Sequence, residues 1–332
     1  MNNKTRMQTL ALALAASLVV SCAGETSPPA NSSTEVESET STFQILNAFS
    51  AVGSSSKTAQ IIAPKLEEYL QQPVDLQFSQ GREAGVGGPT DGNTLVMSTI
   101  GLMALLPAVI EDYPVDPFTD LRPITRTTGT PDILVARSGL GINSVDELID
   151  YTQVNPEQLK YFHIAPTSIH RLEFAAVFGE LGVNAVLDTT RANGNGDAMA
   201  GIADGSLDLL ASTSPYMTQL IEAGDAVPLA VIHPTRMPLY PEVPTLLELG
   251  ATSMSTGSWA GVFAPAGTSD QDIERIFAAM QFAMADPEVV EAINAIGMEI
   301  DLSESPAEFS EFLRSEMQRL RQAAEEYNFS TN

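Results

Sequence analysis

The chain has 332 residues, 44% hydrophobic and 17% charged, which is enough apolar content for about two globular domains and excludes a disordered or fibrous protein. Its 16 basic and 42 acidic residues give a formal net charge of −26, so the basic surface that nucleic-acid binding requires is absent. The single cysteine excludes an intramolecular disulfide, a cysteine-rich zinc site and an iron–sulfur cluster.

The N-terminal segment is typical of an export signal. Residues 1–21 begin with a basic region and continue with an apolar run at 10–20 that is too short to cross a bilayer. The sequence VVSC at 19–22 resembles a bacterial lipobox, which predicts cleavage before Cys22 and lipidation of this residue; the alternatives are an exported protein with a free thiol and an uncleaved anchor. Residues 22–42, rich in Ser, Thr, Glu and Pro, are expected to form a disordered tether.

Short apolar segments alternate with helical periods along the rest of the chain. This alternation predicts an α/β fold with a largely parallel sheet, followed by a second α/β unit. Capping sequences such as Ser144-x-x-Glu147 and Ser305-Pro306 mark helix starts. The expected strands are 43–49, 74–78, 94–97, 133–135, 160–164, 185–187 and 207–210, and the expected helices begin near 55, 144, 168, 269, 286 and 305.

Enzyme and metal motifs are scarce. The three histidines are scattered, and neither a P-loop nor a complete Gly-x-Gly-x-x-Gly occurs, so we expect no metal and no cofactor. Ser54-x-x-Lys57 matches the nucleophile spacing of penicillin-recognising acyl enzymes, but their Ser-Asp-Asn and Lys-Thr-Gly motifs are missing. An envelope hydrolase using Ser54 and Lys57 is therefore the enzymatic alternative, which ester or β-lactam turnover abolished by Ser54→Ala would support.

Two clusters of hydroxyl residues are placed between an expected strand and an expected helix. Residues 53–56 follow the first strand, and Thr167 and Ser168 precede a later helix with His170 in its first turn. Free N–H groups and the helix dipole favour an anion at such positions, although serines also serve simply as helix caps. Because open α/β sheets bind ligands outside the carboxyl ends of their strands, two such loops facing one another predict a carboxylate-binding cleft.

Six further segments carry a resemblance to a known family, the extracytoplasmic solute receptors of tripartite tricarboxylate transporters, called Bug or TctC-type proteins. The resemblance extends over about residues 43–321, and its strength is the order of the segments along the chain. The segments are PTDGNTL at 89–95, YPVDPFTDL at 113–121, TSIHRLEF at 167–174, PEVPTLLELG at 241–250, SWAGVFAPAGT at 258–268 and ADPEV at 285–289.

This resemblance implies a periplasmic-binding-protein-like (type II) fold, a Venus flytrap whose two α/β domains enclose a ligand cleft. Domain 1 is expected at 43–138 and 264–332 and domain 2 at 139–263, with crossings near Ser138 and Ala264. The implied function is a receptor without enzymatic activity that delivers a small organic carboxylate to a permease of large and small membrane subunits; a ligand sensor for a signalling partner is the alternative. We expect a monomer, exported and lipid-anchored in the cell envelope, facing the periplasm.

Carried over by position, the resemblance implies a ligand site built from loops of both domains. Ser56 replaces a family aspartate, which favours a carboxylate ligand without an ammonium group. Arg191 and His170 could instead make structural ion pairs or hydrogen bonds, and Phe49 and Trp259 could belong to the core. The implied ligand-binding residues are Phe49, Gly53, Ser54, Ser55, Ser56, Ser98, Thr99, Thr167, Ser168, His170, Arg191, Ala192, Ser212 and Thr213.

Overall fold

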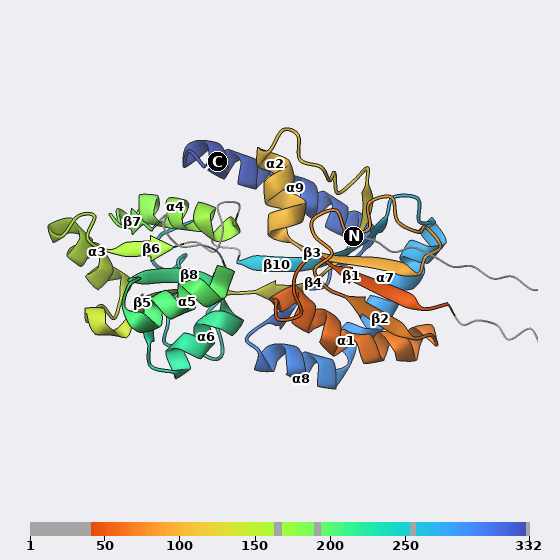
Figure 1. Ribbon diagram of the computed structural model, residues 1–332, viewed down its shortest axis with the longest axis horizontal. Coiled ribbons are helices and arrows are strands. Elements are labelled where there is room, and N and C mark those ends of the chain that lie inside the picture. The colour runs from red at the N-terminus through yellow and green to blue at the C-terminus, as the bar shows by residue number, and fades with distance from the viewer. Residues whose placement is uncertain (1–40, 163–167, 189–193, 253–256, 330–332) are drawn as a thin grey trace, which may run out of the picture. The chain divides into compact units, whose positions relative to one another are not determined.

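The computed structural model describes residues 41–162, 168–188, 194–252 and 257–329. The chain from Thr40 onward forms one compact unit, in which the described strands assemble into two sheets with helices on both faces of each (Figure 1). Cys22 and the expected tether as far as residue 40 lie outside the described residues, so lipidation stays a prediction.

The first sheet has the strand order β11-β4-β10-β3-β1-β2. β1 pairs in parallel with β2 and β3, whereas β10 is antiparallel to β3 and β4, and β11 is antiparallel to β4. Its strands are β1 (Phe43–Asn47), β2 (Val74–Gln77), β3 (Thr94–Thr99), β4 (Leu121–Thr130), β10 (Ser258–Pro265) and β11 (Glu299–Ile300).

The second sheet has the order β7-β6-β8-β5-β9. β6 is parallel to β7 and β8, and β5 is antiparallel to β8 and β9. Both sheets are therefore mixed, not largely parallel as expected, because β4, β5 and β10, which flank the crossings between the sheets, run against their neighbours. The strands are β5 (Asp132–Arg137), β6 (Lys160–Phe162), β7 (Val186–Leu187), β8 (Leu209–Thr213) and β9 (Ala226–Ile232).

Helices cover both faces of each sheet and bury separate apolar clusters. On the first sheet, one face packs against α1, α7 and α8 and the other against η1, α2 and α9; on the second, α3 and α4 pack on one face and α5 and α6 on the other. The helices are α1 (Ser54–Leu70), the π-helical turn η1 (Gly101–Leu105), α2 (Leu106–Val109), the 3₁₀ turn η2 (Ser138–Leu140), α3 (Val145–Val154), α4 (Ile169–Leu181), α5 (Gly194–Asp204), α6 (Ser214–Glu222), α7 (Asp270–Ala285), α8 (Pro287–Ala295) and α9 (Pro306–Glu326).

Predicted capping residues begin several of these helices. Ser144 Oγ accepts the backbone N–H of Glu147 at 3.2 Å, and Ser305 Oγ accepts that of Glu308 at 3.1 Å. Each bond satisfies a helical N–H that has no partner within the helix. The predicted starts of α3 and α9 are thus confirmed.

The chain passes from the first sheet to the second at Pro131, between β4 and β5, and returns between β9 and β10. The expected crossings near Ser138 and Ala264 would assign β5 to the first sheet and β10 to the second. The strand pairing instead places β5 in the second sheet and β10 in the first. Both strands are apolar and buried on both faces, so their composition suits either sheet, and only pairing assigns them.

Candidate functional site

A pocket of about 450 Å³ is lined by residues from the elements of both sheets. It lies at the carboxyl ends of β1, β3 and β8, the position at which open α/β sheets bind ligands. Its described lining consists of Phe49, Gly53, Ser54, Ser55, Thr99, Ile100, Gly101, Leu102, Leu106, Thr130, Ser168, Ile169, His170, Gly194, Asn195, Ser212, Thr213, Tyr216, Ser258, Trp259 and Ala260.

Most of the residues predicted from the sequence meet at this pocket. Nine line it: Phe49, Gly53, Ser54, Ser55, Thr99, Ser168, His170, Ser212 and Thr213. Ser56 and Ser98 are fully buried and do not line it. Ser56 is on α1, and because an α-helix turns by about 100° per residue, its side chain points away from the side of Ser54. Thr167, Arg191 and Ala192 lie outside the described residues. Ligand binding by any of these residues stays a prediction.

The N-termini of α1, α4, α5 and α6 all contribute residues to the pocket wall. Gly53 precedes α1 without a side-chain cap, and no acidic residue lies in the first turn of that helix. Unpaired N–H groups and the helix dipole give such ends a partial positive charge. Among the described lining residues none is Asp, Glu, Lys or Arg. This part of the wall is therefore suited to a small anion without carrying a formal cation other than a protonated histidine.

Some polar groups of the wall are already paired and others are not. The Ser212 hydroxyl donates to Asn195 Oδ1 at 2.8 Å, and that of Ser258 donates to Asp132 Oδ2 at 2.9 Å. By contrast, Thr213 Oγ1 and Trp259 Nε1 are buried without a protein partner. Buried polar groups are rarely unsatisfied, so these two are candidates for contacts with a ligand or its waters.

Aromatic and aliphatic side chains complete the wall. Trp259 is 5% exposed and packs edge-on against Phe309 and Phe312 of α9, with ring centroids 5.8 Å away in each case. It is therefore both a core residue and a wall residue, while Phe49 is 37% exposed at the pocket mouth. The apolar part of the wall suits a ligand with a hydrocarbon chain between its polar groups.

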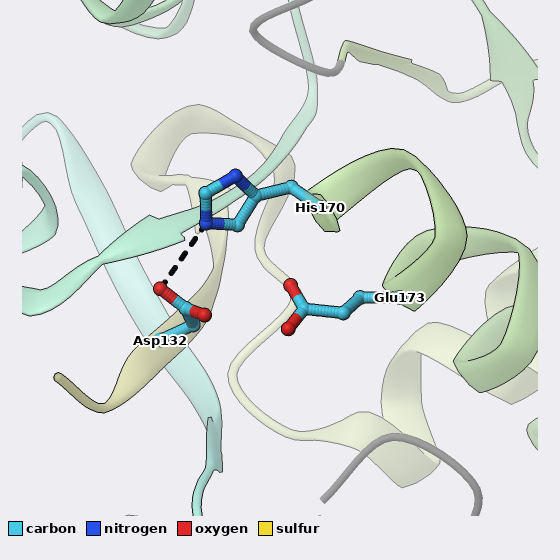
Figure 2. Close-up of side chains that lie close together, drawn as sticks. All are labelled: Asp132, His170 and Glu173. Atoms are coloured by element: carbon cyan, nitrogen blue, oxygen red, sulfur yellow. Dashed lines mark hydrogen bonds and ion pairs between the residues drawn. The ribbon is translucent and has the colours of Figure 1, made fainter. Parts of the chain in front are cut away.

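Beneath His170 lies a cluster of buried ionisable groups that sequence reasoning missed (Figure 2). Asp132 begins β5 and is 0% exposed, and its Oδ1 lies 3.2 Å from His170 Nε2. Glu173, one turn along α4 from His170, is 1% exposed and points toward the pair, and its Oε2 has no hydrogen-bond partner. The His170 Nδ1 atom lies 2.9 Å from Ser168 Oγ.

The proximity of these groups changes their ionisation. Burial by itself lowers the pKa of His170, but the charge of Asp132 and the hydrogen bond to it raise that pKa to about 9. Burial, followed by the charge of Asp132, raises the pKa of Glu173 to about 8. At neutral pH these pKa values make His170 an imidazolium facing Asp132 and keep Glu173 protonated.

The same three side chains are the described residues that could hold a metal ion, since one ligand atom from each lies within 4.8 Å of the others. However, both Asp132 oxygens and both His170 ring nitrogens already have hydrogen-bond partners. An ion pair satisfies these atoms without a metal.

Other residues missed from the sequence are Asn195, Tyr216, Ser258 and Thr130 in the wall and Asn47 at the end of β1. The buried Asn47 accepts the Phe49 N–H at 3.0 Å and lies 3.4 Å from Ser55 Oγ, which holds the loop after β1 against the start of α1. A polar residue at the end of an apolar strand was the available signal for Asn47. No comparable signal existed for the others.

No helix within the described ranges is both long enough and apolar enough to cross a membrane.

The chain is similar to several known proteins in sequence and fold. The chain is 27% identical to the protein BugT of Bordetella pertussis over 290 residues, covering 83% of this chain and 86% of BugT. A solved periplasmic transporter superimposes with a TM-score of 0.78 at 22% identity, covering 88% of this chain and 98% of its own. An R. palustris protein solved with adipate gives a TM-score of 0.76 at 25% identity over 87% of this chain and 98% of its own.

The structural matches show the two-domain α/β fold of periplasmic binding proteins, as the resemblance implied. A family model described as "Tripartite tricarboxylate transporter family receptor" matches residues 62–329, which is most of the chain. The protein therefore belongs to the tripartite tricarboxylate transporter receptor family, TctC.

Proposed function

We propose that this protein is an extracytoplasmic receptor that captures a small organic carboxylate between two domains and delivers it to a tripartite tricarboxylate-type permease. The observation that carries the proposal is the convergence of four helix N-termini on a pocket whose described wall has no acidic side chain. The receptor family and the structural relative solved with adipate, a dicarboxylate, support the ligand class. Binding is the whole activity in this proposal, without covalent chemistry.

Each domain in this proposal is built around one sheet, with domain 2 inserted into domain 1 between Pro131 and Ser258. Contacts between α6 of the second sheet and loops of the first support closure around a ligand. The Tyr216 hydroxyl donates to the carbonyl of Val52 at 3.4 Å, and Ser214 Oγ donates to that of Gly297 at 2.5 Å. Both donors are on α6, so movement of this helix with the second sheet would couple ligand capture to closure.

Export and anchoring rest on the leader alone. The lipobox-like VVSC predicts an acylated Cys22 facing the periplasm, joined to the folded body by the polar tether. Two or three acyl chains at about 0.8 kcal/mol per buried CH₂ would hold the receptor at the membrane, near its permease subunits.

The expected ligand lacks an ammonium group. An ammonium needs a carboxylate or several acceptors around it, and the described wall offers hydroxyl and N–H donors without an acidic residue. Succinate, malate, citrate and adipate should therefore bind more tightly than aspartate or glutamate.

The test is thermal unfolding of residues 22–332, refolded to remove any carried ligand, against a panel of dicarboxylates, citrate, aromatic acids and amino acids. A ligand at about a thousand times its Kd stabilises the folded state by roughly 4 kcal/mol, an effect too large to miss. Stabilisation by one class of carboxylate supports the proposal. Preference for aspartate or glutamate contradicts the predicted ligand class, and ester turnover by the same sample would favour the Ser54 hydrolase alternative instead.

A further inference from the structure

The Ser168 hydroxyl lines the pocket at the start of α4 and meets His170 twice. Its oxygen accepts the backbone N–H of His170 at 3.2 Å and lies 2.9 Å from Nδ1 of the imidazole. Whether Nδ1 carries a proton therefore decides where the Ser168 hydroxyl proton can point.

The opposite ring nitrogen is fixed by Asp132. Nε2 lies 3.2 Å from Asp132 Oδ1, and Oδ2 of the same fully buried carboxylate accepts the Ser258 hydroxyl at 2.9 Å. Since a carboxylate only accepts hydrogen bonds, Nε2 carries a proton in both the neutral and the charged ring. The two forms of His170 thus differ only at Nδ1, the atom beside Ser168.

In the neutral ring, Nδ1 is an acceptor and the Ser168 O–H donates to it, which withdraws the hydroxyl proton from the pocket. In the imidazolium, Nδ1–H donates to Ser168 Oγ. That oxygen then accepts two hydrogen bonds from His170, and its own proton is free to donate into the pocket. A ligand carboxylate gains a donor from Ser168 only in the second state.

We propose that Asp132 and His170 are positioning residues that hold the imidazolium form and thereby direct the Ser168 hydroxyl to the ligand carboxylate, so that the ligand binds more tightly when His170 carries a proton on Nδ1. This inference rests on the proposed function, because it needs an anionic ligand at the pocket.

The charged groups around the ring set the pH range. Asp132 faces it from β5 and Glu173 from α4; on α9, Arg319 acts on Glu173 and pairs with Glu316 at 2.7 Å. Glu173, with a pKa of about 8, gains a negative charge as pH rises, and His170, with a pKa of about 9, loses its positive charge. Both changes disfavour an anion, so binding should weaken with rising pH and should take up protons in this range.

The ring state can be measured without a ligand. Long-range ¹H–¹⁵N spectra of the labelled protein, residues 22–332, distinguish an imidazolium from either neutral tautomer, and His170→Gln assigns the signal. We expect His170 to be an imidazolium at about pH 7 and to titrate near pH 9. A neutral His170 at about pH 7 would overturn the inference, as would stoichiometric divalent metal in protein purified without chelator.

Affinity is then measured by calorimetry with adipate and malate between about pH 5.5 and 9.5, in buffers of different ionisation enthalpy to count protons. Ser168→Ala should weaken binding by about 10- to 100-fold at neutral pH and flatten the pH profile, because one hydrogen bond to a charged group is lost. Asp132→Asn should move the fall in affinity to lower pH, because burial lowers the His170 pKa once the charge of Asp132 is removed. A purely structural role of Asp132 would lower affinity equally at every pH.

Two further variants keep the test interpretable. Glu173→Gln should retain affinity at neutral pH and leave a single titration in the profile. Asp208→Asn removes another largely buried carboxylate of the second domain, one that pairs with Arg137 at 2.8 Å and does not line the pocket, and should leave the profile unchanged.

Unaltered affinity in Ser168→Ala overturns the inference. If neither acid binds at any pH while His170 is an imidazolium, the proposed function fails, and with it the role of Ser168.

Discussion

Thr213 offers a direct test of whether the pocket is built around a ligand. Its Oγ1 lies in the wall, the residue is 8% exposed, and the oxygen has no protein partner. In Thr213→Val a methyl group of similar size replaces the hydroxyl, so the free protein loses no internal hydrogen bond. We expect its stability to be unchanged or higher by up to about 1 kcal/mol, because burial of an unpaired hydroxyl is unfavourable.

Ligand binding should respond in the opposite direction. A hydrogen bond to a charged group contributes about 1.5–3 kcal/mol, so Thr213→Val should weaken carboxylate binding by about 10- to 100-fold. Urea unfolding of the free protein and calorimetric titration with the best carboxylate of the panel measure the two quantities separately.

A matched control is available at Thr268. Its Oγ1 is also buried without a partner and the residue is 2% exposed, but it is not in the pocket wall. Thr268→Val should therefore change stability to a similar extent and leave binding unchanged. The reasoning is refuted if Thr213→Val binds as tightly as the parent protein, or if both valine variants weaken binding equally.

Three other predictions concern the sheet crossing, its ion pair and the leader. His233 Nε2 and Glu299 Oε1 form an ion pair at 2.9 Å. Burial lowers the pKa of His233, but the hydrogen bond to Glu299 raises this pKa overall, and the same hydrogen bond lowers the pKa of Glu299. The ion pair stops stabilising the fold when the pH rises through the raised histidine pKa or falls through the lowered glutamate pKa. Glu299→Gln should therefore lower the free energy of unfolding in urea more at about pH 5.5 than at about pH 8.5. An equal loss at both pH values would contradict this prediction. Gly257 has φ of +68°, and a Cβ there would lie 2.9 and 3.1 Å from two carbonyl oxygens, so Gly257→Ala should destabilise the protein by about 2 kcal/mol or more. The control is Gly250→Ala, at a position where φ is +90° and no atom lies within 4 Å of an added Cβ, and it should cost only about 1 kcal/mol. Cys22→Ser should release the protein from the membrane fraction, whereas retention would contradict lipid anchoring through this residue.

Much of the fold could be predicted because local signals agreed with the final packing. The segments at 43–49 and 94–97 and the capped helices all form close to their expected limits. β4 was missed because LRPITRTTGT has few apolar residues and contains Pro123, which cannot donate to a ladder. A register shift beside the Phe263–Pro123 pair accommodates it. Only the pairing partner, which the sequence does not specify, shows that this segment is a strand.

The candidate site was predicted where one helix turn holds it together. Gly53, Ser54 and Ser55 are adjacent in sequence and stay adjacent at the start of α1, so the hydroxyl cluster was visible. Asp132 and Glu173 are distant from one another along the chain and meet only because α4 packs over the start of β5. Neither residue carries a local signal of burial, because most Asp and Glu side chains lie on the protein surface and this chain has 42 of them.

The placement of charge explains why such an acidic protein can still bind an anion. The described wall has no formal negative charge and presents N–H groups, hydroxyls and helix ends, whose partial charges act at short range and are screened less by salt than charges on an open surface. His170, with a pKa raised to about 9, is the one ionisable side chain of the described wall besides Tyr216. A pH dependence of binding that originates in the described wall therefore arises at His170, on which Asp132 and Glu173 act from beneath. If affinity proves constant while His170 titrates, the protonation state of His170 does not direct the Ser168 hydroxyl to the ligand.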